Sequence, residues 1–172
     1  MHPSVAQQHG LSHPHQHALQ HPHTQQHAQQ HAQHYVKICE LRPAPGNVVN
    51  TAFILLDKWP ATRVSEAGAV VCTALVADGT AAVHMQLWGA EVDALQPGDI
   101  VRLTNGIFSF HKSNLVLRAG KKGTLEKIGE FTMLFVEAPN MSRLQWAPDP
   151  ANPKHWVPRG GMPAGGMAAH GR

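Results

Sequence analysis

Long apolar runs, paired cysteines and charged residues near the N-terminus are all scarce in this chain of 172 residues. No apolar stretch approaches the roughly 18 residues that a membrane-spanning helix needs, so we expect no membrane partner. The two cysteines, Cys39 and Cys72, have neither CxxC spacing nor a histidine at a zinc-site interval. This pattern argues against a disulfide scaffold and a structural zinc site, and it indicates no metal ligands and no cofactor.

The two ends of the chain have biased compositions. Residues 1–34 contain no Lys, Arg, Asp or Glu, but they hold ten of the 14 histidines and nine glutamines. Such a tract has too few aliphatic and aromatic side chains to offset the entropy lost on ordering its backbone, so we predict that it is disordered. Residues 147–172 are rich in Pro and Gly without periodicity, and we predict a second disordered tail. Residues 35–146 between them suit a single domain.

Apolar patterning in this block predicts a small β-barrel. Strands are expected at 48–59, 69–78, 80–88, 100–111 and 114–120, with a short helical turn inside 89–99 and a last apolar run at 131–139. Five strands with a helix between the third and the fourth predict an all-β, five-stranded Greek-key barrel of the OB-fold type. A small β-sandwich is the alternative, but it does not require the helix.

The fourth expected strand changes the face of its apolar side chains in the middle. The apolar residues are at odd positions before Asn105-Gly106 (Val101 and Leu103) and at even positions after it (Phe108 and Phe110), so their parity changes. One extra residue at this point would form a β-bulge that bends a single long strand, as closure of a small barrel requires. The alternative is that Asn-Gly forms a hairpin turn between two very short strands.

An aromatic residue lies on the expected outer face of the third strand. Val83, Met85 and Leu87 alternate with His84, Gln86 and Trp88, so Trp88 shares the polar face. Bases stack on aromatic rings and phosphates attract Lys and Arg, so an indole beside cations is typical of a single-strand binding surface. A tryptophan at a strand end is also a common lid on the core, and this alternative stays open.

Basic residues are concentrated in the second half of the block. Between positions 102 and 127 there are six of them and one acid, Glu126. The alternative interpretation is an ordinary solvated surface. On the expected outer face, we predict nucleic-acid contacts from Trp88, Gln86, His111, Arg118, Arg102, Lys112, Lys121 and Lys122.

Several segments of the block resemble one family. The segments "VKICELRPAPGN", "FILLD", "VADGTAAVHMQLWG", "LQPGDIVRLTNG" and "KIGEFTMLFVEAPN", between Val36 and Asn140, are similar to the SOSS-B family. Members of this family are the eukaryotic single-stranded DNA-binding proteins of the SOSS complex, and they have one OB-fold. "LQPGDIVRLT" is found in several OB-fold families, whereas "KIGEFTMLFVEAPN" is more specific.

The resemblance implies a role and a set of site residues. It implies single-stranded DNA binding in the nucleus, in the DNA damage response and in double-strand break repair by homologous recombination. It also implies an Integrator-type scaffold subunit, docked through Glu130 and Phe131, and a small accessory subunit. The stacking tryptophan of the family falls on Trp88, whereas three other family aromatics fall on Ile107, His111 and Arg118. Imidazole and guanidinium planes can stack on bases, but isoleucine cannot.

Other function classes remain as alternatives. An OB-fold module for RNA and a scaffold that only bridges proteins are both compatible with the pattern. An enzyme would need clustered carboxylates or a metal site, whereas the acids here are scattered among turns. The sequence also contains no recognisable arrangement of catalytic residues. We therefore expect a binding protein that is not an enzyme.

Overall fold

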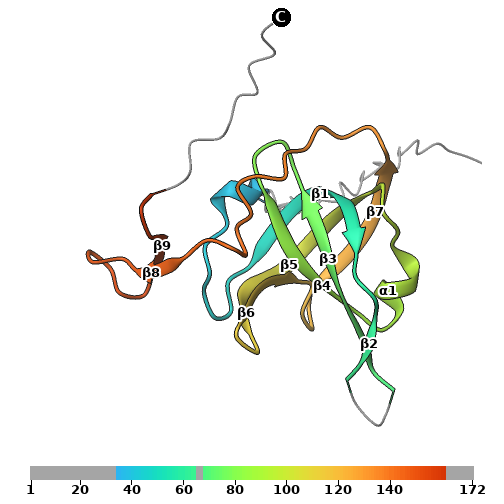
Figure 1. Ribbon diagram of the computed structural model, residues 1–172, viewed down its shortest axis with the longest axis horizontal. Coiled ribbons are helices and arrows are strands. Elements are labelled where there is room, and N and C mark those ends of the chain that lie inside the picture. Colours follow the sequence, from blue (N-terminus) through green and yellow to red (C-terminus); the bar gives the residue numbers. More distant parts are fainter. Residues whose placement is uncertain (1–33, 65–67, 162–172) are drawn as a thin grey trace, which may run out of the picture. The chain divides into compact units, whose positions relative to one another are not determined.

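The computed structural model describes residues 34–64 and 68–161, shown in colour in Figure 1. The tract 1–34, apart from His34, and residues 162–172 lie outside the described residues, so the predictions of disorder there are not addressed. The elements are η1 (Ile38–Glu40), β1 (Val49–Lys58), β2 (Thr62–Arg63), β3 (Val70–Ala77), β4 (Ala82–Trp88), α1 (Ala90–Ala94), β5 (Asp99–His111), β6 (Asn114–Arg118), β7 (Thr124–Glu130), β8 (Trp146–Pro148) and β9 (Trp156–Pro158).

Five strands form a closed ring. They pair in the order β1-β3-β4-β6-β5, and β5 pairs again with β1 to close the ring. Neighbours are antiparallel except β4 and β6, which are parallel. This is the Greek-key barrel of the OB-fold, so the predicted fold class is confirmed and the β-sandwich is excluded.

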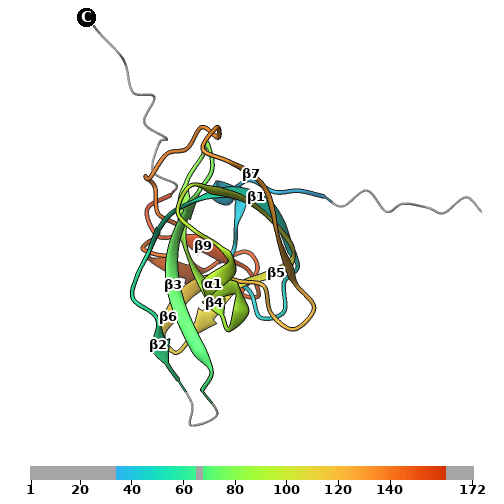
Figure 2. The same cartoon turned by 90° about the vertical axis from the view of Figure 1, so that its right-hand side faces the viewer.

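The alternation in β4 separates the core from the outer face as predicted. Val83, Met85 and Leu87 are fully buried, while His84, Gln86 and Trp88 are half-buried. The helix α1 lies across one end of the barrel in Figure 2, and its Val92 joins the core. The Lys58 ammonium group donates hydrogen bonds to carbonyls at the C-terminal end of this helix, including that of Leu95 at 2.7 Å. Its positive charge stabilises the short helix there, because the C-terminal end of a helix carries a partial negative charge.

The bulge in β5 is also confirmed. Val49 and Thr51 of β1 are two residues apart, but they pair with Gly106 and Leu103, which are three apart. Asn105 takes up the extra residue with a φ of 53°, and its N–H donates to the Asn50 side chain at 2.8 Å. The strand therefore continues through Asn-Gly, and the hairpin alternative is wrong.

Two elements differ from the expected pattern near the end of the barrel. The additional strand β7 pairs with the first half of β5 and was not predicted, because most of its side chains are exposed and carry no alternating apolar signal. The apolar run 131–139 contains no strand or helix, and its Phe131, Leu134 and Phe135 are exposed.

The prediction that residues 147–172 form a disordered tail is wrong for the first part of this segment, which forms a β-hairpin. Strands β8 and β9 are antiparallel. Trp146 lies opposite Pro158, and Pro148 lies opposite Trp156. Trp146 packs edge-on against the core ring of Phe108, with centroids 6.4 Å apart, and lies 5.7 Å from the Arg42 guanidinium. Two tryptophans therefore anchor a Pro-rich segment that its composition alone would leave unstructured. In the described part of the chain, no helix is long and apolar enough to cross a bilayer.

Candidate nucleic-acid interface

Three adjoining hollows form a groove on the outside of the barrel. The Trp88 hollow, of about 440 Å³, is lined by Trp88, Glu91, His111, Arg118, Gly120 and Lys121. The Lys122 hollow, of about 520 Å³, is lined by Gly46, Asn47, Val48, Asn105, Ile107, Lys121 and Lys122. The Trp156 hollow, of about 370 Å³, is lined by Pro43, Ala44, Pro45, Gly46, Ile107, Ser109, Phe110, Arg118 and Trp156. Each pair of hollows shares at least one of Arg118, Lys121 and Ile107, so the three form one continuous surface.

Trp88 lies on this surface and not in the core. Its ring is half-buried and contacts the His111 ring edge-on, with centroids 6.1 Å apart and planes at 81°. The residues that form or pack against the core cluster do not include Trp88. The alternative of a core lid is therefore excluded, and the indole and the imidazole both lie on the outer face, where the sequence placed them.

Glu91 is a residue of this site that was not predicted from the sequence. Its carboxylate accepts a hydrogen bond from the backbone N–H of Trp88 at 2.9 Å and lies in the lining of the Trp88 hollow. The bond fixes the turn into α1 and places one negative charge beside the indole. The signal was available, because Glu91 follows Trp88 by three residues at the start of a helical turn.

Gln86 and Arg118 are neighbours on the parallel strands β4 and β6. Gln86 Oε1 and Arg118 Nη1 are buried without a hydrogen-bond partner in the described part of the chain. A buried polar atom without a partner costs roughly 1–3 kcal/mol. Arg118 lies at the junction of two hollows, whereas Gln86 lines none of the three.

The six basic residues between positions 102 and 127 separate into three sets. Lys121 and Lys122 line the groove together with Arg118, and none of the three has an ion pair within residues 34–64 and 68–161. Lys112 is exposed in the β5–β6 turn beside His111, but it does not line the groove.

Two cations are held elsewhere by carboxylates. Arg102 forms an ion pair with Glu126 of β7 at 3.1 Å, on the half of β5 that also pairs with β1. Lys127 bonds to Asp99 at 2.7 Å and to Glu130, and these hydrogen bonds raise the pKa of its ammonium group. The structure therefore does not bring Arg102 to the groove, although the sequence placed it there.

Ile107 lines both the Lys122 and the Trp156 hollows. It supplies an apolar wall where the resembling family has an aromatic ring. Two aromatic rings nearby were not predicted as contacts. Trp156 belongs to the hairpin, and Phe110 shares the parity of the buried Phe108, so the sequence wrongly placed it on the core side. Phe110 is 52 % exposed, and its ring centroid lies 6.0 Å from that of Trp156.

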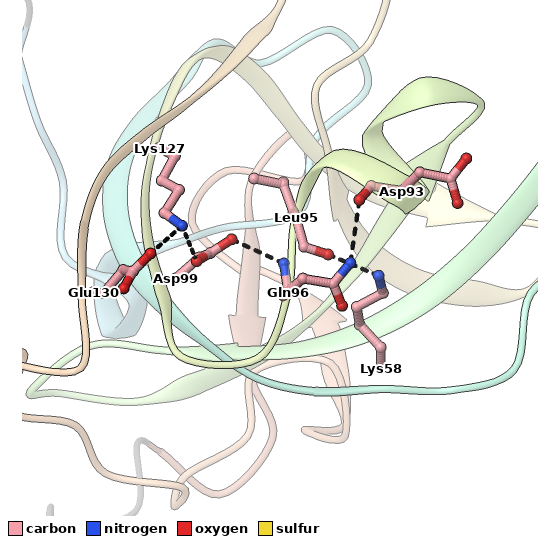
Figure 3. Close-up of polar contacts among 7 residues, drawn as sticks. All are labelled: Lys58, Asp93, Leu95, Gln96, Asp99, Lys127 and Glu130. Carbon is pink, nitrogen blue, oxygen red and sulfur yellow. Dashed lines mark hydrogen bonds and ion pairs between the residues drawn. The ribbon is translucent and has the colours of Figure 1, made fainter.

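The predicted partner-binding pair lies at the end of β7. Figure 3 shows Glu130 bonded to Lys127, which also contacts Asp99. The next residue, Phe131, has a φ of 55° and is 74 % exposed, while its N–H donates to the carbonyl of Gly98 at 2.9 Å. These contacts present the Phe131 ring to solvent on an ordered backbone.

His84, the third polar residue of β4, has a different neighbourhood. Its ring packs edge-on against Trp59, with centroids 5.6 Å apart. Burial lowers the pKa of His84, and the nearby charge of Arg143 lowers it further, so this imidazole stays neutral at pH 7. Among the described residues, no cluster of three His, Cys, Asp or Glu side chains suits a metal ion.

The fold is shared with a protein of solved structure. No model of a known protein family matches the chain. The solution structure of the hypothetical protein F20O9.120 from Arabidopsis thaliana is similar with a TM-score of 0.54 and 22 % identity, over 67 % of this chain and 88 % of that one. This likeness shows a shared fold.

Two archaeal structures are more distantly similar. The replication factor A related protein from Methanobacterium thermoautotrophicum has a TM-score of 0.46 and 13 % identity, over 55 % of this chain and 91 % of that one. The OB domain of Ta0387 from Thermoplasma acidophilum has a TM-score of 0.47 and 19 % identity, over 59 % of this chain and 93 % of that one.

Proposed function

We propose that this protein binds single-stranded DNA along the groove, as a binding protein without catalytic activity. The observation that carries the proposal is the meeting of Trp88, His111 and Arg118 with Lys121 in one hollow on the outside of an OB barrel. OB-folds bind oligonucleotides on this kind of surface, where bases stack on rings and cations follow the phosphates. The indole stacks a base, and the flat groups of His111 and Arg118 support its neighbours.

The finer role rests on the resemblance of the sequence to the SOSS-B family. We propose a nuclear protein that acts in the response to double-strand breaks and in repair by homologous recombination. Glu130 and Phe131 match the docking pair of that family, and the exposed ring of Phe131 supports a contact with a scaffold subunit of the Integrator type. A small accessory subunit is the second expected partner.

A direct titration tests the central proposal. The full chain is titrated into fluorescein-labelled oligothymidine, and anisotropy is followed with unlabelled duplex DNA or oligouridine as competitors. We expect the single DNA strand to bind and the duplex to compete weakly. Stronger competition by oligouridine would favour the RNA-binding alternative, and no binding to any nucleic acid would favour the scaffold alternative.

A further inference from the structure

We propose that the Trp156 hollow is a second base-binding subsite, in which the C-terminal hairpin extends the groove beyond the barrel. The occupant is a base of the same single strand that crosses the Trp88 hollow. The inference rests on the proposed function and adds to it a stacking platform made by Phe110 and Trp156.

The rings that form this platform come from two distant parts of the chain. Phe110 belongs to β5 and is 52 % exposed, which is unusual for a phenylalanine in a barrel strand. Trp156 of β9 is half-buried and meets it at a ring-centroid distance of 6.0 Å, with the planes tilted by 59°. A ring pair with an exposed Phe110 and a half-exposed Trp156 offers aromatic surface on which a base of any identity can stack.

The hairpin holds Trp156 in place through its other tryptophan. Trp146 donates a hydrogen bond from its indole N–H to the carbonyl of Met141 at 3.1 Å and packs against the buried ring of Phe108. Pro148 then pairs with Trp156 across the two strands. Since Trp146 packs against the core, the position of Trp156 is determined by the barrel, and the platform is formed before a ligand arrives.

The opposite wall of the hollow is also fixed. The N–H of Ala44 donates to the carbonyl of Phe108 at 3.2 Å, and the N–H of Phe108 donates to Asn47 Oδ1 at 3.1 Å. These bonds tie the loop that contains Pro43 and Pro45 to the edge of β5. The hollow is therefore a slot with one proline-rich side and one aromatic side.

Charge and continuity indicate which ligand fits. The lining contains Arg118 and no carboxylate, so the slot favours an anionic chain. Arg118 also lines the Trp88 hollow, and its buried Nη1 lacks a hydrogen-bond partner among the described residues. One guanidinium thus lies between the two aromatic platforms, where a phosphate that links two bound bases would pass.

The length of the bound strand provides the test. The affinities of the full chain and of its Trp156→Ala variant are measured by anisotropy for oligothymidines of about 4, 8 and 12 nucleotides, within the site sizes known for OB-folds. We expect the variant to lose roughly 5- to 100-fold on the longest strand and little on the shortest, which the Trp88 hollow holds alone. The Trp156→Phe variant keeps a ring and should restore most of the loss.

Two controls separate the possible outcomes. Trp59→Ala removes a tryptophan that is 40 % exposed but lies outside the groove, and it should bind as the unchanged protein does. Circular dichroism and the thermal midpoint show whether Trp156→Ala keeps its fold, and Phe110→Ser provides a second variant from the barrel side. If Trp88→Ala weakens binding but both platform variants bind every strand length as tightly as the unchanged protein does, the subsite is overturned. Absence of binding by the unchanged protein would instead overturn the proposed function, and the subsite with it.

Discussion

The carboxylate of Glu91 lies 2.9 Å from the backbone nitrogen of Trp88 and accepts its hydrogen. One side chain therefore orders the turn that presents the indole and also places a negative charge in a groove proposed for a polyanion. Glu91→Gln keeps an oxygen that accepts the same hydrogen bond and removes the charge. Two unit charges about 8 Å apart in water interact by about 0.5 kcal/mol, so we expect affinity for oligothymidine to rise about two-fold at low salt.

The gain in affinity from Glu91→Gln should fade as salt screens the charge. A titration series between about 50 and 200 mM salt, where phosphate contacts weaken strongly, measures this loss. Glu91→Ala is the matched comparison, because it removes the hydrogen bond as well as the charge. If Glu91→Gln binds more weakly than the unchanged protein, the carboxylate contributes to the contact directly, and the electrostatic interpretation is wrong.

Replacing Trp88 tests the main stacking contact. Trp88→Ala removes the indole that lies edge-on to His111 and should cost roughly 1–3 kcal/mol of binding free energy, measured by anisotropy with labelled oligothymidine. Because Trp88 lies outside the core cluster, the thermal midpoint should change little. Unchanged affinity in Trp88→Ala would remove the indole from the interface.

The separation of the cations into free and paired groups predicts a selective salt response. Lys121 and Lys122 line the groove without ion pairs in the described part of the chain, so Lys122→Ala should reduce the slope of log K against log salt by about 0.7. Arg102→Ala should leave the slope unchanged, because Arg102 is paired with Glu126 away from the groove. Equal reductions in both variants would show that the strand passes over β5 and β7 as well.

Partner docking is separable from nucleic-acid binding. Phe131 lies at the end of β7 and lines none of the three hollows, so Phe131→Ala should leave oligothymidine affinity unchanged. The same variant should lose retention of an Integrator-type scaffold subunit in a pull-down with the full chain as bait. Retention equal to that of the unchanged protein would exclude the Phe131 ring from the docking contact.

The sequence predicted the barrel because period-two burial is strong where one face of a strand meets the core. The alternation around Met85 and the parity change at Asn105 were sufficient to predict β4 and the bulged β5. Strand β7 gives no such signal, since it adds to the outside of β5 and leaves most of its side chains in solvent.

Strand alternation predicted the site only where it shows which face of a strand a residue occupies. Trp88 and His111 were both placed on the outer face, where their rings meet. Arg102 was placed on the same face, but it lies before the bulge and pairs with Glu126 away from the groove. Trp156 was missed because its hairpin is stabilised by contact with the barrel and not by local propensity. Proline at Pro148 and Pro158 even opposes a strand there, so two tryptophans in a Pro-rich segment were the available signal.

The ion pair between Lys127 and Asp99 makes stability depend on pH. Burial alone would raise the pKa of the Asp99 carboxyl, but hydrogen bonds from Lys127 and from the Gln96 backbone, with the charge of Lys127, outweigh it and lower the pKa below 3.8. A carboxylate with a lowered pKa stabilises the fold above its ordinary value, and this contribution is lost as pH falls through the folded-state pKa. Asp99→Asn should therefore reduce the free energy of unfolding by roughly 1–2 kcal/mol at pH 7.

Denaturant titrations at several pH values give the measurement for this last prediction. The difference between the unchanged protein and Asp99→Asn should be constant from neutral pH down to about pH 5 and should narrow below 3.8, where the carboxyl takes up its proton. Glu126→Gln is the matched control, since the Glu126 side chain is 63 % exposed and surface pairs contribute at most about 1 kcal/mol. A difference for Asp99→Asn that persists unchanged at low pH would mean that the carboxylate charge is not what stabilises this end of the barrel, because only the charged form gains from Lys127.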